Sequence, residues 1–227
     1  MKIKQYAIPA FVAAVLIASM AGMAAAADDV ASTKHNLSLA SSGQVPAGTT
    51  LEDYGEICAY CHTPHGGQNS APLWNRSFST ATYQMYDNTH SSTIDMTVDG
   101  QPTGVSLACL SCHDGTIGLD VITNPPNTFA GTVPATGAGN VMPSGSFAFL
   151  DTDLRNDHPI SVTYDTGLDP AFNSKTAVTT GGLRLFGDGT TDKVQCASCH
   201  NPHDGTNTPF LRKSNAQSDL CLTCHIK

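Results

Sequence analysis

The chain contains the stretch Cys58-Ala-Tyr-Cys61-His62 and repeats its pattern as Cys109-Leu-Ser-Cys112-His113, Cys196-Ala-Ser-Cys199-His200 and Cys221-Leu-Thr-Cys224-His225. These four copies hold all 8 cysteines of the 227 residues. Each copy reads C-x-x-C-H, the attachment signature of c-type haem. Two thiols at this spacing on a helical turn can both form thioethers with the haem vinyl groups, and the adjacent imidazole then lies under the iron. The sequence therefore predicts four covalently bound haem c groups, with these eight cysteines as attachment points and His62, His113, His200 and His225 as proximal ligands.

Disulfides, zinc ribbons and thioredoxin-like redox pairs are the competing interpretations of the paired cysteines. None of them needs a histidine directly after the second cysteine. Histidine makes up 9 of the 227 residues, so four such coincidences have a chance of roughly two in a million. The repeated histidine therefore favours haem attachment over these alternatives.

Five histidines remain for the second axial position of the irons: His35, His65, His90, His158 and His203. We predict His35, His65, His158 and His203 as distal ligands, because His90 stands in a polar stretch typical of a loop. An iron with two histidines has no open position, which favours electron transfer over enzymatic catalysis. Methionine is the alternative sixth ligand, and Met85, Met96 and Met142 are the methionines outside the N-terminal segment.

Two of the predicted distal ligands follow a proximal histidine by three residues, in Cys61-His62-Thr-Pro-His65 and Cys199-His200-Asn-Pro-His203. A histidine at this spacing lies on the proximal side of its own haem and cannot reach the far face. The intervening proline fixes φ and directs the second histidine away. His65 and His203 are therefore expected to bind a different haem from that of the preceding motif.

The N-terminal segment has the order of a secretory signal peptide. Lys2 and Lys4 precede an apolar run over residues 7–18, and small residues at 24–27 precede Asp28. A membrane anchor is the alternative, but the apolar run is too short to span a bilayer. We therefore expect cleavage of residues 1–27 and a secreted chain of residues 28–227. Its 9 basic against 19 acidic residues argue against nucleic acid or an anionic membrane surface as a partner.

Composition and motif spacing predict the fold class. With 20 Gly, 13 Pro and 7% aromatic residues, we expect a mostly irregular chain with short helices and few strands, wrapped around four closely stacked haems. Two N-terminal haems are expected in residues 28–120, a Gly/Pro-rich connection in 121–156, and two C-terminal haems in 157–227. Short helices are expected over residues 51–62, 107–113 and 218–225, and strands over 160–164 and 183–186.

The motifs and their flanking segments also resemble a known family. Those segments are His62-Thr-Pro-His65-Gly-Gly, Ala71-Pro-Leu-Trp-Asn-Arg76, Cys112-His113-Asp-Gly-Thr, Asn156-Asp-His-Pro159 and Phe210-Leu-Arg-Lys-Ser-Asn215. Together they resemble the doubled-CXXCH multihaem cytochromes, and in order and haem count the OmcE-type outer-surface tetrahaem cytochromes of metal-reducing bacteria. The resemblance implies bis-histidine haems in a stacked line. Matches around Lys34-His35 and Asp157-His158 imply that both histidines are distal ligands.

The same resemblance implies an extracellular electron-conducting filament. One subunit would lend an axial histidine to a haem of its neighbour, with His65 as the first candidate and His35 as the second. The acceptor haem would lie near His200 and His225. External acceptors such as metal oxides and other multihaem cytochromes would be its redox partners. A monomeric periplasmic tetrahaem shuttle and a haem reductase acting on nitrite or hydroxylamine are the alternatives.

Overall fold

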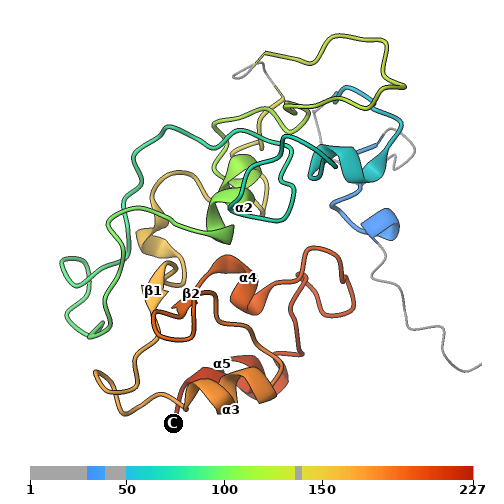
Figure 1. Ribbon diagram of the computed structural model, residues 1–227. Helices are drawn as coiled ribbons and strands as arrows, with labels where there is room; N and C mark the ends of the chain where they lie inside the picture. The colour runs from blue at the N-terminus through green and yellow to red at the C-terminus, as the bar shows by residue number, and fades with distance from the viewer. Residues whose placement is uncertain (1–29, 39–49, 136–139, 227) are drawn as a thin grey trace, which may run out of the picture.

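The computed structural model describes residues 30–38, 50–135 and 140–226. The predicted signal peptide over residues 1–27 and residues 136–139 of the predicted Gly/Pro-rich connection lie outside these residues. The described part of the chain is mostly irregular, with short helices and two short strands (Figure 1). This confirms the predicted fold class. No helix among the described residues is long and apolar enough to cross a membrane.

The helices and strands are short, and α2 with nine residues is the longest described helix. In chain order they are the 3-10 helices and α-helices η1 (Val30–Ser32), η3 (Ile57–Tyr60), α2 (Val105–His113), η4 (Leu154–Asn156), α3 (Lys175–Thr180), α4 (Cys196–Cys199), η5 (Ala216–Ser218) and α5 (Asp219–Cys224), and the strands β1 (Val162–Thr163) and β2 (Lys193–Val194). In Figure 1, α2 lies in the upper half of the molecule, and α3 and α5 lie together at the lower end.

Each C-x-x-C-H motif is placed on a helix or helical turn. Such a turn brings two thiols three positions apart to one side, which is the arrangement that double attachment needs. The predicted helices at 107–113 and 218–225 are confirmed as α2 and α5. The prediction for residues 51–62 was wrong in extent. Gly55 has a φ of 68° and Glu56 is extended, so only η3 is helical there.

The sheet differs from the sequence-based expectation in one strand. Val162 and Thr163 of β1 pair antiparallel with Val194 and Lys193 of β2, so the prediction at residues 160–164 holds in part. The predicted strand over residues 183–186 holds only at its last residue, because Phe186 exchanges two hydrogen bonds of 2.9 Å with Lys193 of β2. Leu183 is buried against Tyr164 and Val178 and takes no part in this pairing. Helix α3 was not predicted, although Ser174 caps it by accepting a hydrogen bond from the Ala177 N–H.

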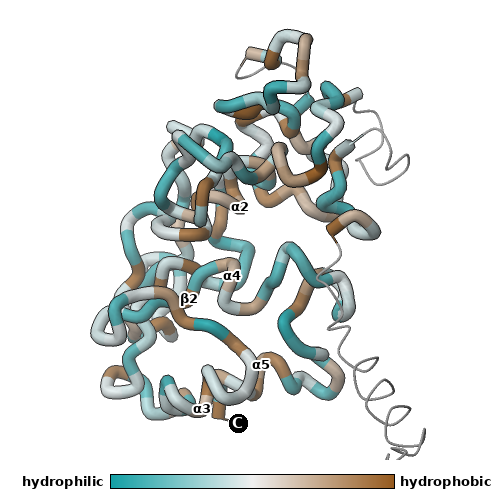
Figure 2. The backbone as a smooth tube through the Cα atoms, turned by 45° about the vertical axis from the view of Figure 1, so that its right-hand side comes forward, coloured by the Kyte–Doolittle hydropathy of each residue, from teal (hydrophilic) through white to brown (hydrophobic). Residues whose placement is uncertain are grey.

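Buried apolar side chains form several small clusters. Figure 2 shows hydrophobic residues, in brown, in short segments distributed along the tube. Four clusters stand out, formed by Tyr54, Ala59, Tyr60 and Ile122; by Tyr83, Met85, Leu110 and Leu154; by Leu51, Leu119 and Met142; and by Tyr164, Val178 and Leu183. Each cluster includes or touches a residue of a C-x-x-C-H motif: Cys61, Leu110, Cys112 or Cys224. The apolar core is therefore divided among the first, second and fourth motifs.

Candidate functional site

The four motifs define four sites, which we number in chain order. The first contains Cys58, Cys61 and His62; the second Cys109, Cys112 and His113; the third Cys196, Cys199 and His200; and the fourth Cys221, Cys224 and His225. All eight thiols are free of disulfides. The predicted attachment residues are thus available for covalent chemistry.

Cysteines of successive motifs lie near one another. The Cys109 thiol donates a hydrogen bond to the Cys196 sulfur, which raises the pKa of Cys109 and lowers that of Cys196. Burial, with a smaller effect from the neighbouring Cys112, raises the pKa of Cys61 to about 12. Burial and Cys224 likewise raise the pKa of Cys199 to about 11. The sites therefore adjoin in the order first, second, third, fourth.

Helices α2 and α4 bring the second and third sites together. The two helices pack against each other, and a buried polar network joins their N-termini. The Gln195 side-chain oxygen accepts hydrogen bonds from the Ser106 hydroxyl at 2.5 Å and the Ser161 hydroxyl at 3.2 Å. The Cys196 N–H donates to the Ser106 oxygen at 3.0 Å. Because these groups are buried and mutually paired, the network holds the two sites at a defined separation.

The imidazole rings at these sites are oriented by backbone carbonyls. Nδ1 hydrogen bonds join His62 to Pro72 at 2.8 Å, His113 to Ala148 at 2.8 Å, His200 to Pro209 at 2.9 Å, His35 to Pro202 at 3.1 Å and His158 to Pro159 at 3.0 Å. An Nδ1–H that donates to a carbonyl leaves the Nε2 lone pair for a metal. Burial lowers the pKa of His35 to about 4, so that ring is neutral at pH 7 and suited to bind iron.

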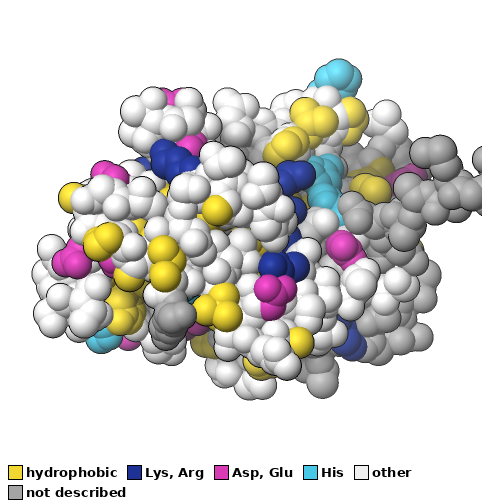
Figure 3. Space-filling model, turned by 90° about the horizontal axis from the view of Figure 1, so that it is seen from below, with side chains coloured by type: hydrophobic (Ala, Val, Ile, Leu, Met, Phe, Trp, Pro, Cys, Tyr) yellow, Lys and Arg dark blue, Asp and Glu magenta, His cyan; other side chains and the backbone are white. Residues whose placement is uncertain are grey.

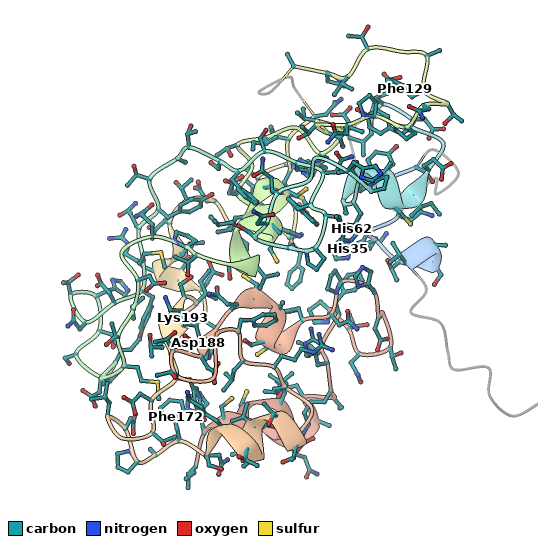
Figure 4. The ribbon with its side chains drawn as sticks, viewed as in Figure 1. His35, His62, Phe129, Phe172, Asp188 and Lys193 are labelled. Carbon is teal, nitrogen blue, oxygen red and sulfur yellow. The ribbon has the colours of Figure 1, made fainter. Side chains whose placement is uncertain are left out.

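Three pairs of imidazoles face each other. The ring centroids are 6.0 Å apart for His62 and His203, 6.1 Å for His113 and His35, and 6.4 Å for His225 and His158. Each pair joins a predicted proximal ligand to a predicted distal one. Figure 4 shows His35 and His62 where the upper and lower parts of the ribbon meet.

These separations fit one metal between each pair of rings. Two imidazoles that bind a metal from opposite sides, each with a bond of about 2 Å, hold their ring centroids roughly 6 Å apart. The fourth site also offers the space, since a cavity of about 400 Å³ lies beside Cys221, Cys224, His158 and His225 with mainly apolar lining residues. The donor set and the geometry therefore fit an iron with two axial histidines at three of the sites.

The third site differs from the other three. His200 is exposed, and within the described residues neither His200 nor His65 takes part in a ring pair. His65 is also exposed. His90, the histidine left out of the predicted ligands, packs its ring on Tyr86 at 5.1 Å. The structure thus places three of the four predicted distal ligands opposite a proximal one and leaves His65 apart.

The first and third sites belong to a structural repeat, formed by residues 58–75 and 196–212. Both copies read C-A-x-C-H-x-P-H and continue to a Pro-Leu or Pro-Phe pair. The matching hydrogen bonds are His62 to Pro72 and His200 to Pro209, Thr63 to Leu73 and Asn201 to Phe210, and Asn75 to Cys61 and Arg212 to Cys199. In this repeat His65 is the counterpart of His203.

Two features of the repeat escaped the sequence analysis. Leu73 and Phe210 both have a left-handed backbone, with φ of 54° and 62°, and the shared proline before each was the available signal. The ring of Phe210 lies 4.3 Å from that of His35. Figure 3, seen from below, shows exposed hydrophobic side chains scattered over this face. Leu222 inside the fourth motif and Ile226 directly after it have 42% and 54% of their surface exposed.

Comparison with known proteins agrees with this reading of the sites. Residues 190–227 match the family model for the doubled CXXCH motif, and this segment spans the third and fourth sites. No curated protein matches the chain. The match and the four motifs indicate covalently bound haem c, and they support assignment of the protein as a multihaem c-type cytochrome.

Proposed function

We propose that the protein transfers electrons through four covalently bound haems, each held by two histidines, as a subunit of an extracellular filament of the OmcE type. The main support for ligation by two histidines is the distance between the ring centroids of the three imidazole pairs, which is 6.0, 6.1 and 6.4 Å. In this proposal His203 serves the first site, His35 the second and His158 the fourth.

The paired imidazoles define the chemistry at these sites. Bound haem supplies a one-electron redox centre. His62 and His203 would hold the iron of their site from both sides and would exclude water or substrate from it, as would the other two pairs. Outer-sphere electron transfer is the reaction compatible with a closed coordination sphere. The electrostatic interactions between the thiols of Cys61 and Cys112, Cys109 and Cys196, and Cys199 and Cys224 support a continuous path from the first site to the fourth.

The filament is supported by His200, the one proximal histidine that has no facing imidazole among the described residues. His200 needs a sixth ligand, and His65 is an exposed histidine whose repeat counterpart His203 faces His62. We assign His65 of one subunit to the His200 iron of the next. In this assignment the acceptor haem is the one at His200 and not the one at His225. His35 then binds a haem of its own chain. A donor and an acceptor on different surfaces produce head-to-tail contacts, which build an open helical filament unless a rotation closes them.

The location and partners follow from the same proposal. The signal-peptide pattern supports export, and the family resemblance supports the cell surface and acceptors such as metal oxides. The chain has 19 acidic and 11 basic residues, so a soluble partner is expected to present basic side chains. Other multihaem cytochromes are the natural exchange partners for a chain with exposed haem sites. Negative-stain images of the purified protein test the proposal. Filaments would support it, whereas a protein that stays monomeric at high concentration would favour the periplasmic electron shuttle.

A haem reductase is the second candidate, because the same His200 site favours it. If no neighbour supplies a sixth ligand, the metal there has an open position for a small molecule such as nitrite or hydroxylamine. A high-spin spectrum in the resting, assembled protein would select this alternative. A fully low-spin spectrum excludes it.

The haem count is the first testable prediction. The protein should carry four thioether-linked haems after denaturation, because each motif retains both cysteines and the proximal histidine. Intact-mass spectrometry of the unfolded chain measures the number of attached haems directly. A mass that corresponds to fewer than four, or disulfides among the motif cysteines, would contradict the proposal.

Replacement of His158 tests the pairing at the fourth site. The His158→Ala protein should gain one high-spin haem that binds carbon monoxide, because His225 loses the ring that faces it at 6.4 Å. The His90→Ala protein is the matched control and should stay low-spin, since His90 contacts Tyr86 instead of a motif histidine. Absorption spectra of the reduced proteins with and without carbon monoxide give the result. A high-spin haem in His90→Ala but not in His158→Ala would show that His90, and not His158, is the distal ligand.

A further inference from the structure

The three imidazole pairs fall into two orientation classes. The rings of His62 and His203 are nearly parallel, with 19° between their planes. The rings of His113 and His35 are nearly perpendicular at 88°, and those of His225 and His158 make an angle of 74°. Each class would give the metal between the rings a different electronic environment.

The reason lies in how an imidazole interacts with a metal. An imidazole donates π electron density mainly perpendicular to its own plane. Two parallel rings therefore act on the same d orbital of a low-spin ferric ion and separate its energy from the partner orbital. Two perpendicular rings act on different d orbitals and leave them nearly equal in energy. The first arrangement gives a rhombic paramagnetic signal, and the second gives a strongly anisotropic one with a higher maximum g value.

Two residues that follow the third motif, Pro202 and Phe210, contact the ring of His35. The His35 Nδ1–H donates to the Pro202 carbonyl at 3.1 Å. The Phe210 ring lies 4.3 Å from the His35 ring, tilted by 37°. Phe210 itself is held by its carbonyl, which accepts the Asn201 N–H at 2.7 Å. His35 is therefore clamped between a fixed carbonyl and an aromatic ring.

The structural repeat supplies a comparison for Phe210. Its counterpart Leu73 has the same left-handed backbone and also accepts a hydrogen bond through its carbonyl. The Leu73 side chain is 53% exposed. The shared backbone geometry therefore does not require an aromatic side chain at this position. Only the second copy of the repeat has an aromatic ring at this position, and that ring contacts His35, a predicted distal ligand.

We propose that Phe210 is a positioning residue that holds His35 perpendicular to His113, so that the second haem is a strongly anisotropic low-spin centre while the first is rhombic. The inference rests on the bis-histidine ligation proposed above. The rings of His225 and His158 make an angle of 74°, so the fourth haem is expected to be strongly anisotropic like the second. The protein therefore contains at least one haem of each class, and its sites are electronically unequal although their ligands are the same.

Electron paramagnetic resonance of the fully oxidised full-length protein tests the two classes. We expect strongly anisotropic and rhombic low-spin signals in the same spectrum. Low-spin signals of a single class would overturn the inference while leaving bis-histidine ligation intact. A high-spin signal from a site other than the third would instead contradict the ligation, so the two failures are distinguishable.

The Phe210→Leu protein tests the positioning role. We expect the strongly anisotropic signal to lose the intensity of one haem, which reappears at a lower maximum g value, with no gain of high-spin haem. Phe210→Tyr keeps the ring and should retain the original spectrum. Phe147→Leu is the control, because Phe147 is an aromatic residue with 90% of its surface exposed. An unchanged spectrum in Phe210→Leu would overturn the proposal. If that protein does not accumulate, a changed spectrum in Phe210→Tyr would overturn it equally.

Discussion

The His65→Ala protein is expected to fold, carry four haems and fail to form filaments. In the proposed assembly His65 is the sixth ligand of the neighbour's third site, where His200 has no facing ring among the described residues. Loss of the imidazole removes the coordination bond at the interface and leaves one haem in four high-spin. Negative-stain images and the high-spin absorption of the oxidised protein are the measurements. Free imidazole added to the variant should restore the low-spin spectrum without restoring filaments.

The His35→Ala protein is the matched control for this experiment. His35 faces His113 of its own chain at 6.1 Å, so its loss should also create one high-spin haem but leave the filaments intact. Filaments that persist in His65→Ala would remove His65 from the interface. Filaments lost in His35→Ala and retained in His65→Ala would give the role to His35, the second candidate from the sequence.

The Arg76→Met protein is expected to be strongly destabilised. The Arg76 side chain is fully buried and donates hydrogen bonds to the carbonyls of Gly118 at 2.6 Å, Leu119 at 2.8 Å and Ser111 at 3.0 Å. Methionine fills similar space but leaves these buried acceptors unpaired. We expect a loss of about 3–5 kcal/mol in the free energy of unfolding. Guanidinium unfolding of the haem-loaded protein, followed by circular dichroism, measures it.

The position of Arg76 explains why its effect should reach beyond local packing. Ser111 stands between Cys109 and Cys112 of the second motif, and the preceding Asn75 donates its N–H to the Cys61 carbonyl at 2.8 Å. Residues 75 and 76 therefore tie the first site to the second. If these hydrogen bonds orient the first two motifs, the folded Arg76→Met protein should also show a shifted visible haem spectrum.

Arg155→Met is the control for the arginine substitution. Arg155 pairs with Asp153 at 2.6 Å, and the two side chains are 39% and 40% exposed. A solvent-exposed ion pair contributes little to the free energy of unfolding. An unfolding midpoint of Arg76→Met equal to that of Arg155→Met would show that the buried hydrogen bonds contribute no more than this surface pair.

Local sequence was sufficient to predict the features that depend on neighbouring residues. The spacing of Cys109, Cys112 and His113 predicts a helical turn, and α2 contains all three. The abundance of Gly and Pro predicts an irregular chain, because these residues interrupt regular elements. The helix over residues 51–62 was predicted too long, because the positive φ of Gly55 and the extended backbone of Glu56 prevent η3 from beginning before Ile57. The strand over 183–186 is reduced to a single bridge between Phe186 and Lys193, because Leu183 packs in a buried apolar cluster instead of pairing with β2.

Tertiary structure decided which histidines face each other. The sequence predicts only that His203 binds a haem other than that of the preceding motif. The fold places its ring opposite that of His62. The burial of Arg76 and the contact of Phe210 with His35 likewise depend on segments far apart in the chain. The sequence by itself thus determined where haem is expected to attach, because attachment needs only residues within one helical turn. The tertiary structure determined which second imidazole faces the proximal histidine at three of the four sites, because such a pair needs two distant segments to meet within a few ångströms.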